Sequence, residues 1–252
     1  SSPVTVNGIP AEMDGRRFFA DIELTEKINT VTASTITPYG NYSQELTLVW
    51  DKKSFKRYNF FFDDCSFFLR SITLNRPKSI FDEMFLGRLK SIHDKYGTFF
   101  TLNLFFHDDH HDFSISDMPD DYKAEFQAAS DWLKMSFHAK SEFPDRPYQH
   151  ARAEKITEDC TRVCREIIRF AGEECLSDST TVHWGEANRE CVRALRAMGM
   201  RSLTGYFERL PDGTPLVAYY TDGALLDHIG ARDFWLDTAE DMLFGRIDLV
   251  LN

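Results

Sequence analysis

Two adjacent carboxylates, Asp63 and Asp64, follow the apolar run Phe60–Phe62. Carboxylates at the end of a buried segment are costly unless a metal ion or a proton compensates their charge. Aspartates in such a position also commonly cap the turn or helix that comes next. The pair therefore indicates either a metal-dependent site or a capped turn at the end of a strand.

Another candidate pair, His138 and Glu142, follows the apolar segment 135–137. The two residues are four apart in a turn-like segment, so both side chains can reach one metal ion. A lone histidine at a strand end is more commonly a partly buried core residue. Because strand ends in α/β folds gather functional groups, the presence of Asp63 and Asp64 at the corresponding level of another strand favours a metal site.

An imidazole and an indole stand together at His183 and Trp184. Such a pair suits a sugar-binding floor, since the indole can stack on a sugar ring and the imidazole can donate a proton. An aromatic lid over the core is the alternative. The loop 107–112 is dense in carboxylates and imidazoles, which either bind a metal by themselves or are simply solvated. His107, nearest the strand, is expected to border the site.

The segments between these candidates must form the scaffold that positions them. From residue 53 onward, the pattern predicts strands over 59–62, 98–106, 135–138, 181–184 and 201–206. It predicts helices over 79–95 and 120–133, within 149–171, and over 187–198. Repeated strand-then-helix order indicates parallel strands joined by crossover helices, in a barrel or an open sheet.

Residues 1–52 follow a different pattern. Segments of alternating polarity, rich in β-branched residues, occupy 4–6, 17–24, 29–34 and 44–50. Turn-forming residues separate them, among them Asn7-Gly8, Asp14-Gly15 and the segment 38–41. We therefore expect a small β-sandwich-like module over 1–52 and the main α/β domain over 53–252.

The composition narrows the choice of partners. The net charge is −11, from 40 acidic and 29 basic residues. This charge repels a phosphate backbone and argues against nucleic acid as a partner. No stretch approaches the roughly 20 apolar residues of a membrane helix. The five cysteines are odd in number and form no Cys-x-x-Cys pair, so they do not fix the redox compartment.

Taken in order, the candidate residues resemble the motifs of the polysaccharide deacetylase family, also called the NodB-homology or carbohydrate esterase family 4 fold. The first motif of that family, an apolar strand with paired Asp, corresponds to Phe62-Asp63-Asp64, and its Ala-Thr-Phe-Phe strand to 97–100. Its second motif has two histidines four apart, where this chain has His138 and Glu142. Its third motif falls at 183–186. The resemblance covers roughly residues 55–207.

The resemblance implies a distorted (β/α) barrel over 53–252. Residues 1–52 are similar to the small immunoglobulin-like modules attached to bacterial glycan-active enzymes. The implied activity is removal of acetyl groups from N- or O-acetylated oligo- or polysaccharide. The implied cofactor is a divalent metal, usually zinc, which activates a water molecule. Such an enzyme is expected to act outside the cytoplasm.

The resemblance also implies roles for individual residues. Asp63 would be the catalytic base. Asp64, His138 and Glu142 would be the metal ligands, and His107 and Trp184 would border the sugar. Glu142 in place of the family's histidine gives a harder ligand set, which could favour another metal. The family's arginine of the third motif and its late Leu-x-His, the source of the general acid, are not visible. His183 is the first substitute for that acid and His228 the second.

Two other functions fit the same residues. A non-catalytic glycan-binding protein on a degenerate deacetylase scaffold would explain the missing arginine and acid, together with the β module at the front. A metal-dependent hydrolase acting on other amide or imide substrates would share the site residues, and only substrate profiling would separate it from a deacetylase.

Overall fold

The computed structural model describes residues 2–52 and 60–250 of the 252-residue chain. Contacts between Cα atoms divide the chain into two compact units, Ser1–Arg57 and Tyr58–Asn252. The sequence led us to expect this division after residue 52. Asn59, expected to open the first strand of the larger unit, lies outside the described residues.

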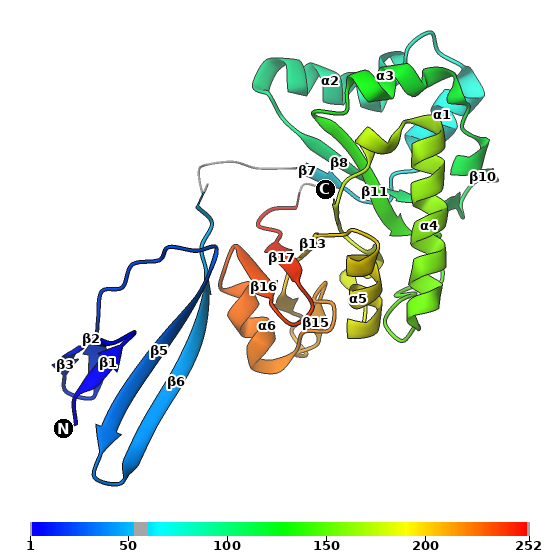
Figure 1. Cartoon of the computed structure of the whole chain (residues 1–252). Coiled ribbons are helices and arrows are strands. Elements are labelled where there is room, and N and C mark those ends of the chain that lie inside the picture. Colours follow the sequence, from blue (N-terminus) through cyan, green and yellow to red (C-terminus); the bar gives the residue numbers. More distant parts are fainter. Residues whose placement is uncertain (1, 53–59, 251–252) are drawn as a thin grey trace. The chain divides into compact units, whose positions relative to one another are not determined.

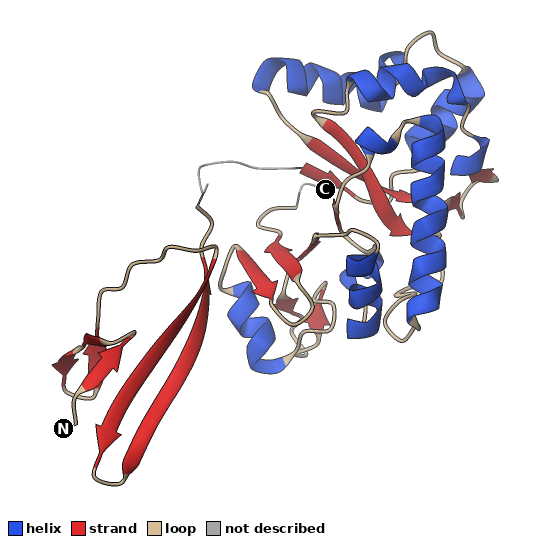
Figure 2. Cartoon of the chain, in the orientation of Figure 1, coloured by secondary structure: helices blue, strands red, loops and turns tan. Residues whose placement is uncertain are grey.

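The first unit consists of β-strands, as Figure 2 shows. A four-stranded antiparallel sheet has the order β2-β1-β5-β6, and a separate antiparallel pair joins β3 to β4. The long hairpin β5–β6 is the largest element of the unit (Figure 1). The strand bounds are β1 (Val4–Val6), β2 (Ile9–Pro10), β3 (Glu12–Asp14), β4 (Arg17–Phe19), β5 (Ile28–Thr37) and β6 (Gly40–Val49).

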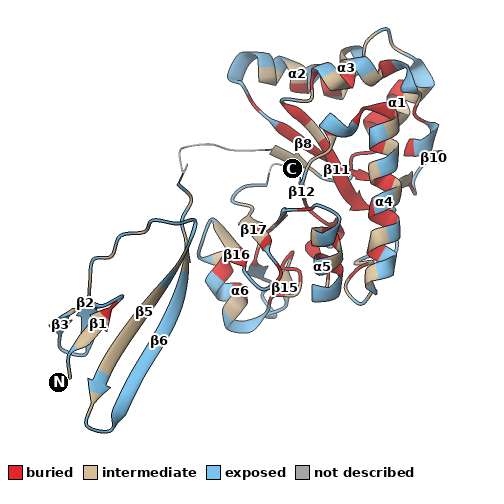
Figure 3. Ribbon diagram, in the orientation of Figure 1, coloured by how far each residue is buried: buried red, intermediate tan, exposed pale blue. Residues whose placement is uncertain are grey.

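The second unit begins with a parallel sheet in the order β11-β8-β7. Its central strand β8 is buried along its whole length, as expected for a strand covered on both faces (Figure 3). The elements of this half are β7 (Phe60–Phe62), α1 (Phe67–Asn75), η1 (Ile80–Asp82), α2 (Met84–Tyr96), β8 (Phe100–Phe105), β9 (His107–Asp108), β10 (Phe113–Ser114), η2 (Ile115–Asp117), η3 (Asp120–Tyr122), α3 (Lys123–Ala128) and β11 (Leu133–Ala139).

A second sheet has the order β12-β13-β17-β16, in which β12, β13 and β17 are parallel and β16 is antiparallel to β17. β14 and β15 form a separate antiparallel pair. The elements are α4 (Ala153–Phe170), η4 (Glu173–Cys175), β12 (Ser179–Thr180), η5 (His183–Gly185), α5 (Arg189–Ala197), β13 (Ser202–Gly205), β14 (Glu208–Arg209), β15 (Pro215–Leu216), α6 (Gly223–Gly230), β16 (Phe234–Asp237) and β17 (Met242–Arg246).

The two sheets meet where β11 passes the segment that leads into β12. Met135 forms a parallel bridge with Leu176, and the backbone N–H of Ser177 donates to the Met135 carbonyl at 2.8 Å. The Thr180 hydroxyl donates to the Phe137 carbonyl. These contacts bring the carboxyl end of β11 beside the segment that follows β12.

The prediction of a distorted (β/α) barrel over residues 53–252 is wrong. Among the described residues, six α-helices accompany several small sheets, and none of these sheets closes on itself. Segment 181–184, expected as a strand, follows the two-residue β12, and its last two residues lie in the 3-10 turn η5. The antiparallel strand β16 then ends the second sheet. Barrel closure requires the parallel strand-and-crossover repeat to continue, and an antiparallel edge strand interrupts it.

Helix α4 shows why these residues fold as they do. Its buried apolar side chains recur every three or four residues, which places them on one face: Ile156, Cys160, Val163, Ile167 and Phe170. This face packs against β11, among other elements. Across all described residues, no helix is both long and apolar enough to cross a membrane.

The buried side chain of Tyr148 links α4 to the end of β11 through hydrogen bonds. Its side chain is fully buried, and its hydroxyl donates to Asp159 Oδ2 at 3.0 Å and accepts from the Lys140 N–H at 3.2 Å. Burial, reinforced by the charge of Asp159, raises the pKa of Tyr148 well above its usual 10.0. The hydroxyl therefore remains a hydrogen-bond donor at any ordinary pH.

We expect Tyr148→Phe to lower the free energy of unfolding by about 1–3 kcal/mol, because it leaves buried polar partners unsatisfied. Urea denaturation followed by circular dichroism measures this loss. Tyr96→Phe is the matched control, since Tyr96 is 62% exposed at the end of α2 and should change stability by less than about 0.5 kcal/mol. Equal stability losses in the two variants would contradict the anchoring role of Tyr148.

Candidate metal centre

The paired aspartates form a turn in which their side chains take different directions. Asp64 has a φ of 58°, an uncommon left-handed conformation for a residue other than glycine. The Asn103 carbonyl fixes the turn by accepting from the Cys65 N–H at 3.0 Å. Asp63 Oδ1 accepts a hydrogen bond from Asn103 Nδ2 at 2.7 Å, whereas Asp64 Oδ1 lies 3.1 Å from His138 Nε2. The two adjacent carboxylates thus lie at different nitrogens of His138, with Asp64 Oδ1 at Nε2 and Asp63 Oδ1 4.0 Å from Nδ1.

Three side chains converge next to this turn: Asp64, His138 and His183. His138 Nε2 lies 3.1 Å from His183 Nδ1, and that nitrogen lies 3.7 Å from Asp64 Oδ1. His138 stands where the pairing of β11 with β8 shifts register, between Phe137 and Ala139. Such irregularities re-aim a side chain, here toward the two other members.

Backbone carbonyls determine which ring nitrogens of the histidines carry hydrogen. His138 Nδ1 lies 2.5 Å from the Thr181 carbonyl, and His183 Nε2 lies 3.1 Å from the Glu142 carbonyl. A carbonyl oxygen can only accept, so both of these nitrogens are N–H donors. His138 Nε2 and His183 Nδ1 therefore direct lone pairs toward Asp64 in the neutral histidines. Three electron-rich atoms at such short range require a proton or a cation between them.

The pKa shifts follow from this arrangement. Partial burial by itself would raise the pKa of Asp64, but the hydrogen bond and charge of His138 lower it below its usual 3.8. Burial by itself would lower the pKa of His138, but the charge of Asp63 and the contacts with Asp64 raise it above 6.5. Burial and the neighbouring charge of His138 lower the pKa of His183. In the absence of a metal ion, His138 is therefore the imidazole that holds the proton.

The spacing of the cluster fits a metal ion. A tetrahedral zinc ion with bonds of about 2.0–2.1 Å keeps its ligand atoms roughly 3.3 Å apart. The observed separations of 3.1, 3.1 and 3.7 Å bracket that value. The carbonyls of Thr181 and Glu142 supply the outer hydrogen bonds that orient metal-bound imidazoles in proteins. Asp64, His138 and His183 can thus hold a metal ion.

Metal binding at this cluster should release a proton in a pH-dependent way. The raised pKa of His138 means that a metal ion competes with a proton for Nε2. Below that pKa, we expect the apparent affinity for zinc to fall roughly tenfold per pH unit. Calorimetric titrations in two buffers with different ionisation enthalpies, at about pH 6 and about pH 8, count the released protons. Zinc binding without proton release at about pH 6, which is below the raised pKa of His138, would contradict this competition.

The other predicted site residues are not members of the cluster. The Glu142 carboxylate pairs with His110 Nε2 at 2.5 Å and is not brought together with Asp64 and His138; its backbone carbonyl instead holds His183. His183, expected as a catalytic acid, stands in the position that Glu142 was expected to fill. His107 on β9 contacts Ser114 Oγ at 3.0 Å. His228 is exposed on α6 and is not a member of the cluster.

Trp184 lies beside the cluster and faces outward. Its ring centroid is 6.0 Å from that of His183, and 44% of the residue is exposed. Both Trp184 and Gly185 have positive φ, at 60° and 54°. A Cβ atom on Gly185 would lie 2.2 Å from Val217 Cγ1, so only glycine fits there. This tight turn holds the indole at the surface next to His183.

Asn103 is the residue that sequence reasoning missed. It is fully buried in β8 and contacts Asp63 directly. A buried asparagine must find hydrogen-bond partners, so its place inside the apolar segment Phe100–Phe105 was the available signal. The orienting carbonyls of Thr181 and Glu142 left no signal in the sequence, because any residue type supplies a carbonyl.

Comparisons with protein-family models, with curated proteins and with solved structures return no match for this chain. Its function therefore has to be argued from the site.

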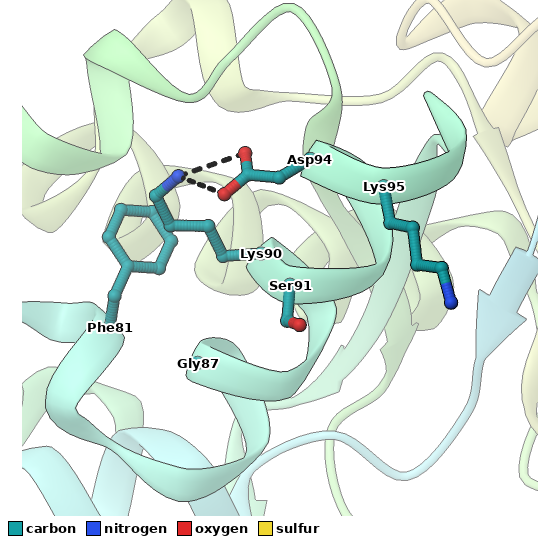
Figure 4. Close-up of a pocket in the computed structure, with 6 residues that line it drawn as sticks. All are labelled: Phe81, Gly87, Lys90, Ser91, Asp94 and Lys95. Atoms are coloured by element: carbon teal, nitrogen blue, oxygen red, sulfur yellow. Dashed lines mark hydrogen bonds and ion pairs between the residues drawn. The ribbon is translucent and has the colours of Figure 1, made fainter.

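A depression on the surface of α2 is separate from the candidate metal centre (Figure 4). Within it, Lys90 Nζ donates to both carboxylate oxygens of Asp94, at 2.9 and 2.7 Å. Its lining residues are Phe81, Gly87, Lys90, Ser91, Asp94 and Lys95. None of them belongs to the cluster of Asp64, His138 and His183.

Proposed function

We propose that the protein is a metal-dependent hydrolase that removes acetyl groups from N- or O-acetylated carbohydrate. In this proposal Asp64, His138 and His183 hold a divalent metal ion, zinc in the first instance, and Asp63 is the general base. The observation that carries the proposal is the convergence of the two imidazole lone pairs on the Asp64 carboxylate at 3.1–3.7 Å.

The exposure of the Asp64 side chain supports a catalytic metal site over a purely structural one. The side chains of His138 and His183 are 3% and 9% exposed, whereas that of Asp64 is 63% exposed. A structural zinc site is closed by its protein ligands, whereas a catalytic site keeps one position for water or substrate. A site with three protein ligands, one of them exposed, resembles a catalytic metal site.

Asp63 is suited to proton transfer because it borders the ligands without joining them. Its side chain is 39% exposed, and Oδ1 is fixed by Asn103. Bound at the cluster, the metal ion would supply Lewis-acid activation of water and of the acetyl carbonyl. Asp63 can take up a proton from the attacking water and return it to the leaving amine or alcohol. Trp184 offers a ring on which a sugar can stack. A polysaccharide substrate would place the protein outside the cytoplasm.

The test combines metal analysis with an acetate assay. Purified protein should contain about one equivalent of zinc or regain it after dialysis. It should then release acetate from acetylated chitooligosaccharides or acetylated xylan. Release from other amides but not from acetylated sugars would keep the hydrolase and reject the carbohydrate substrate. Binding of glycans without turnover, with any divalent metal supplied, would instead favour a non-catalytic glycan-binding protein.

A further inference from the structure

Asn103 is a polar residue in the middle of the buried strand β8, with an exposure of 0%. It holds the aspartate turn at two points. Its side-chain Nδ2 donates to Asp63 Oδ1 at 2.7 Å, and its backbone carbonyl accepts from the Cys65 N–H at 3.0 Å. The side chain and the backbone of one residue thus fix the base and the turn that carries it.

The orientation of the Asn103 amide follows from its partners. Its Nδ2 lies 2.7 Å from Oδ1 of the Asp63 carboxylate, which can only accept. A flipped amide would place two oxygens against each other at Asp63 and lose the donor. The NH2 group therefore faces Asp63. Hydrogen bonds from buried donors to a carboxylate are the strong, orienting kind.

We propose that Asn103 is the positioning residue for Asp63, a role that rests on Asp63 being the base of the proposed hydrolase. By holding Oδ1, Asn103 sets the rotation of the carboxyl group, so that Oδ2 is presented to the attacking water. A neutral amide achieves this without adding charge beside the metal ligands. Asn103 acts through Asp63 and does not itself contact the cluster of Asp64, His138 and His183.

The neighbouring strand provides a matched control. Ser136 is paired in register with Asn103, is fully buried, and its Oγ has no hydrogen-bond partner within the described ranges 2–52 and 60–250. Ser136→Ala therefore changes a buried polar residue next to Asn103 without touching Asp63. A general sensitivity of this part of the core would affect both positions equally.

The first readout is kinetic. Asn103→Leu removes the donor while keeping a similar side-chain volume, and we expect kcat for acetate release to fall about 10–100-fold. KM and the Kd for zinc should stay within about threefold, because the ligands are unchanged. Ser136→Ala should leave all three values within about twofold. A fall in zinc affinity parallel to the fall in kcat would overturn the positioning role, since Asn103 would then support the ligand turn as a whole.

The second readout is a double-mutant cycle with Asp63→Asn. If Asn103 acts through Asp63, Asn103→Leu should reduce the residual rate of Asp63→Asn by less than about twofold. The urea midpoints of the corresponding cycle with Asp63→Ala, which removes the acceptor of the Asn103 hydrogen bond, should also be non-additive when measured without metal. If Asn103→Leu does not fold, Asn103→Ser replaces it in both readouts.

The outcomes separate the two proposals. Additive effects in both cycles would overturn the positioning role of Asn103, even if the wild-type protein is active. A wild-type protein without acetate release would overturn the proposed function, while the urea cycle would still decide whether Asn103 and Asp63 are coupled.

Discussion

His138→Gln is expected to weaken zinc binding by more than about 100-fold and to abolish acetate release. Loss of an outer hydrogen-bond partner of a metal ligand costs roughly 10–100-fold in affinity or activity, and loss of the ligand itself should cost more. His138 is the most buried member of the cluster and lies 3.1 Å from both Asp64 and His183. Competition titration with a zinc-binding dye measures the affinity, and the acetate assay measures the activity.

His228→Gln is the matched control for this prediction. His228 belongs to the same unit but is exposed in the last turn of α6, so its loss should leave zinc affinity and activity within about twofold. Tight binding of zinc by His138→Gln, in a folded protein, would show that the metal sits elsewhere. It would thereby remove the basis of the proposed function.

Asp63→Asn is expected to lower kcat by about 10²–10⁴-fold, the usual contribution of a general base. The Kd for zinc should stay within about threefold, because Asp63 is not a member of the ligand cluster. The amide keeps an oxygen that can accept from Asn103 Nδ2, so the turn should be retained. Zinc titration, acetate-release kinetics and thermal unfolding of the same preparation measure the three quantities.

The control is Asp131→Asn, an exposed carboxylate that precedes β11 and so lies at the opposite end of that strand from His138. It should leave kcat unchanged within about twofold. If Asp63→Asn lost zinc affinity together with activity, Asp63 would be a ligand and the division of roles between the paired aspartates would be wrong.

Much of the candidate site could be predicted from local sequence. Apolar runs ending in polar residues marked the carboxyl ends of β7 and β11, and parallel strands bring such ends to one edge of a sheet. Asp64 and His138 lie together for this reason. His183 joins them from 45 residues further along the chain, and its contact depends on how β12 passes β11. Local spacing favoured Glu142 instead, four residues from His138.

The fold was harder to predict than the site. The alternation of strands and helices is a local property, and it correctly indicated the parallel sheet formed by β7, β8 and β11 and, in the second sheet, the strand β13. Barrel closure depends on which strands pair at the ends of the series, and no segment of the sequence records that choice. The antiparallel placement of β16 was therefore not foreseen.

Helix α1 was missed for a different reason. Its buried residues Phe68, Leu69 and Ile72 have helical spacing, but the helix is short and directly follows the aspartate turn. The phenylalanines at its start continue the aromatic composition of β7, so the segment resembles an extension of the strand. Short apolar segments of this length are compatible with either structure.

The Thr181 carbonyl, which orients His138, belongs to the same short segment that supplies His183. Opening of this one segment would remove a ligand and release the orienting contact of a second ligand in a single event. The rate of metal exchange would then depend on the rate at which this backbone segment opens, and not on the stepwise dissociation of individual side chains. The residence time of a bound ion would in this sense measure local unfolding of this segment, which hydrogen bonds from Ser177 and Thr180 hold to Met135 and Phe137 of β11.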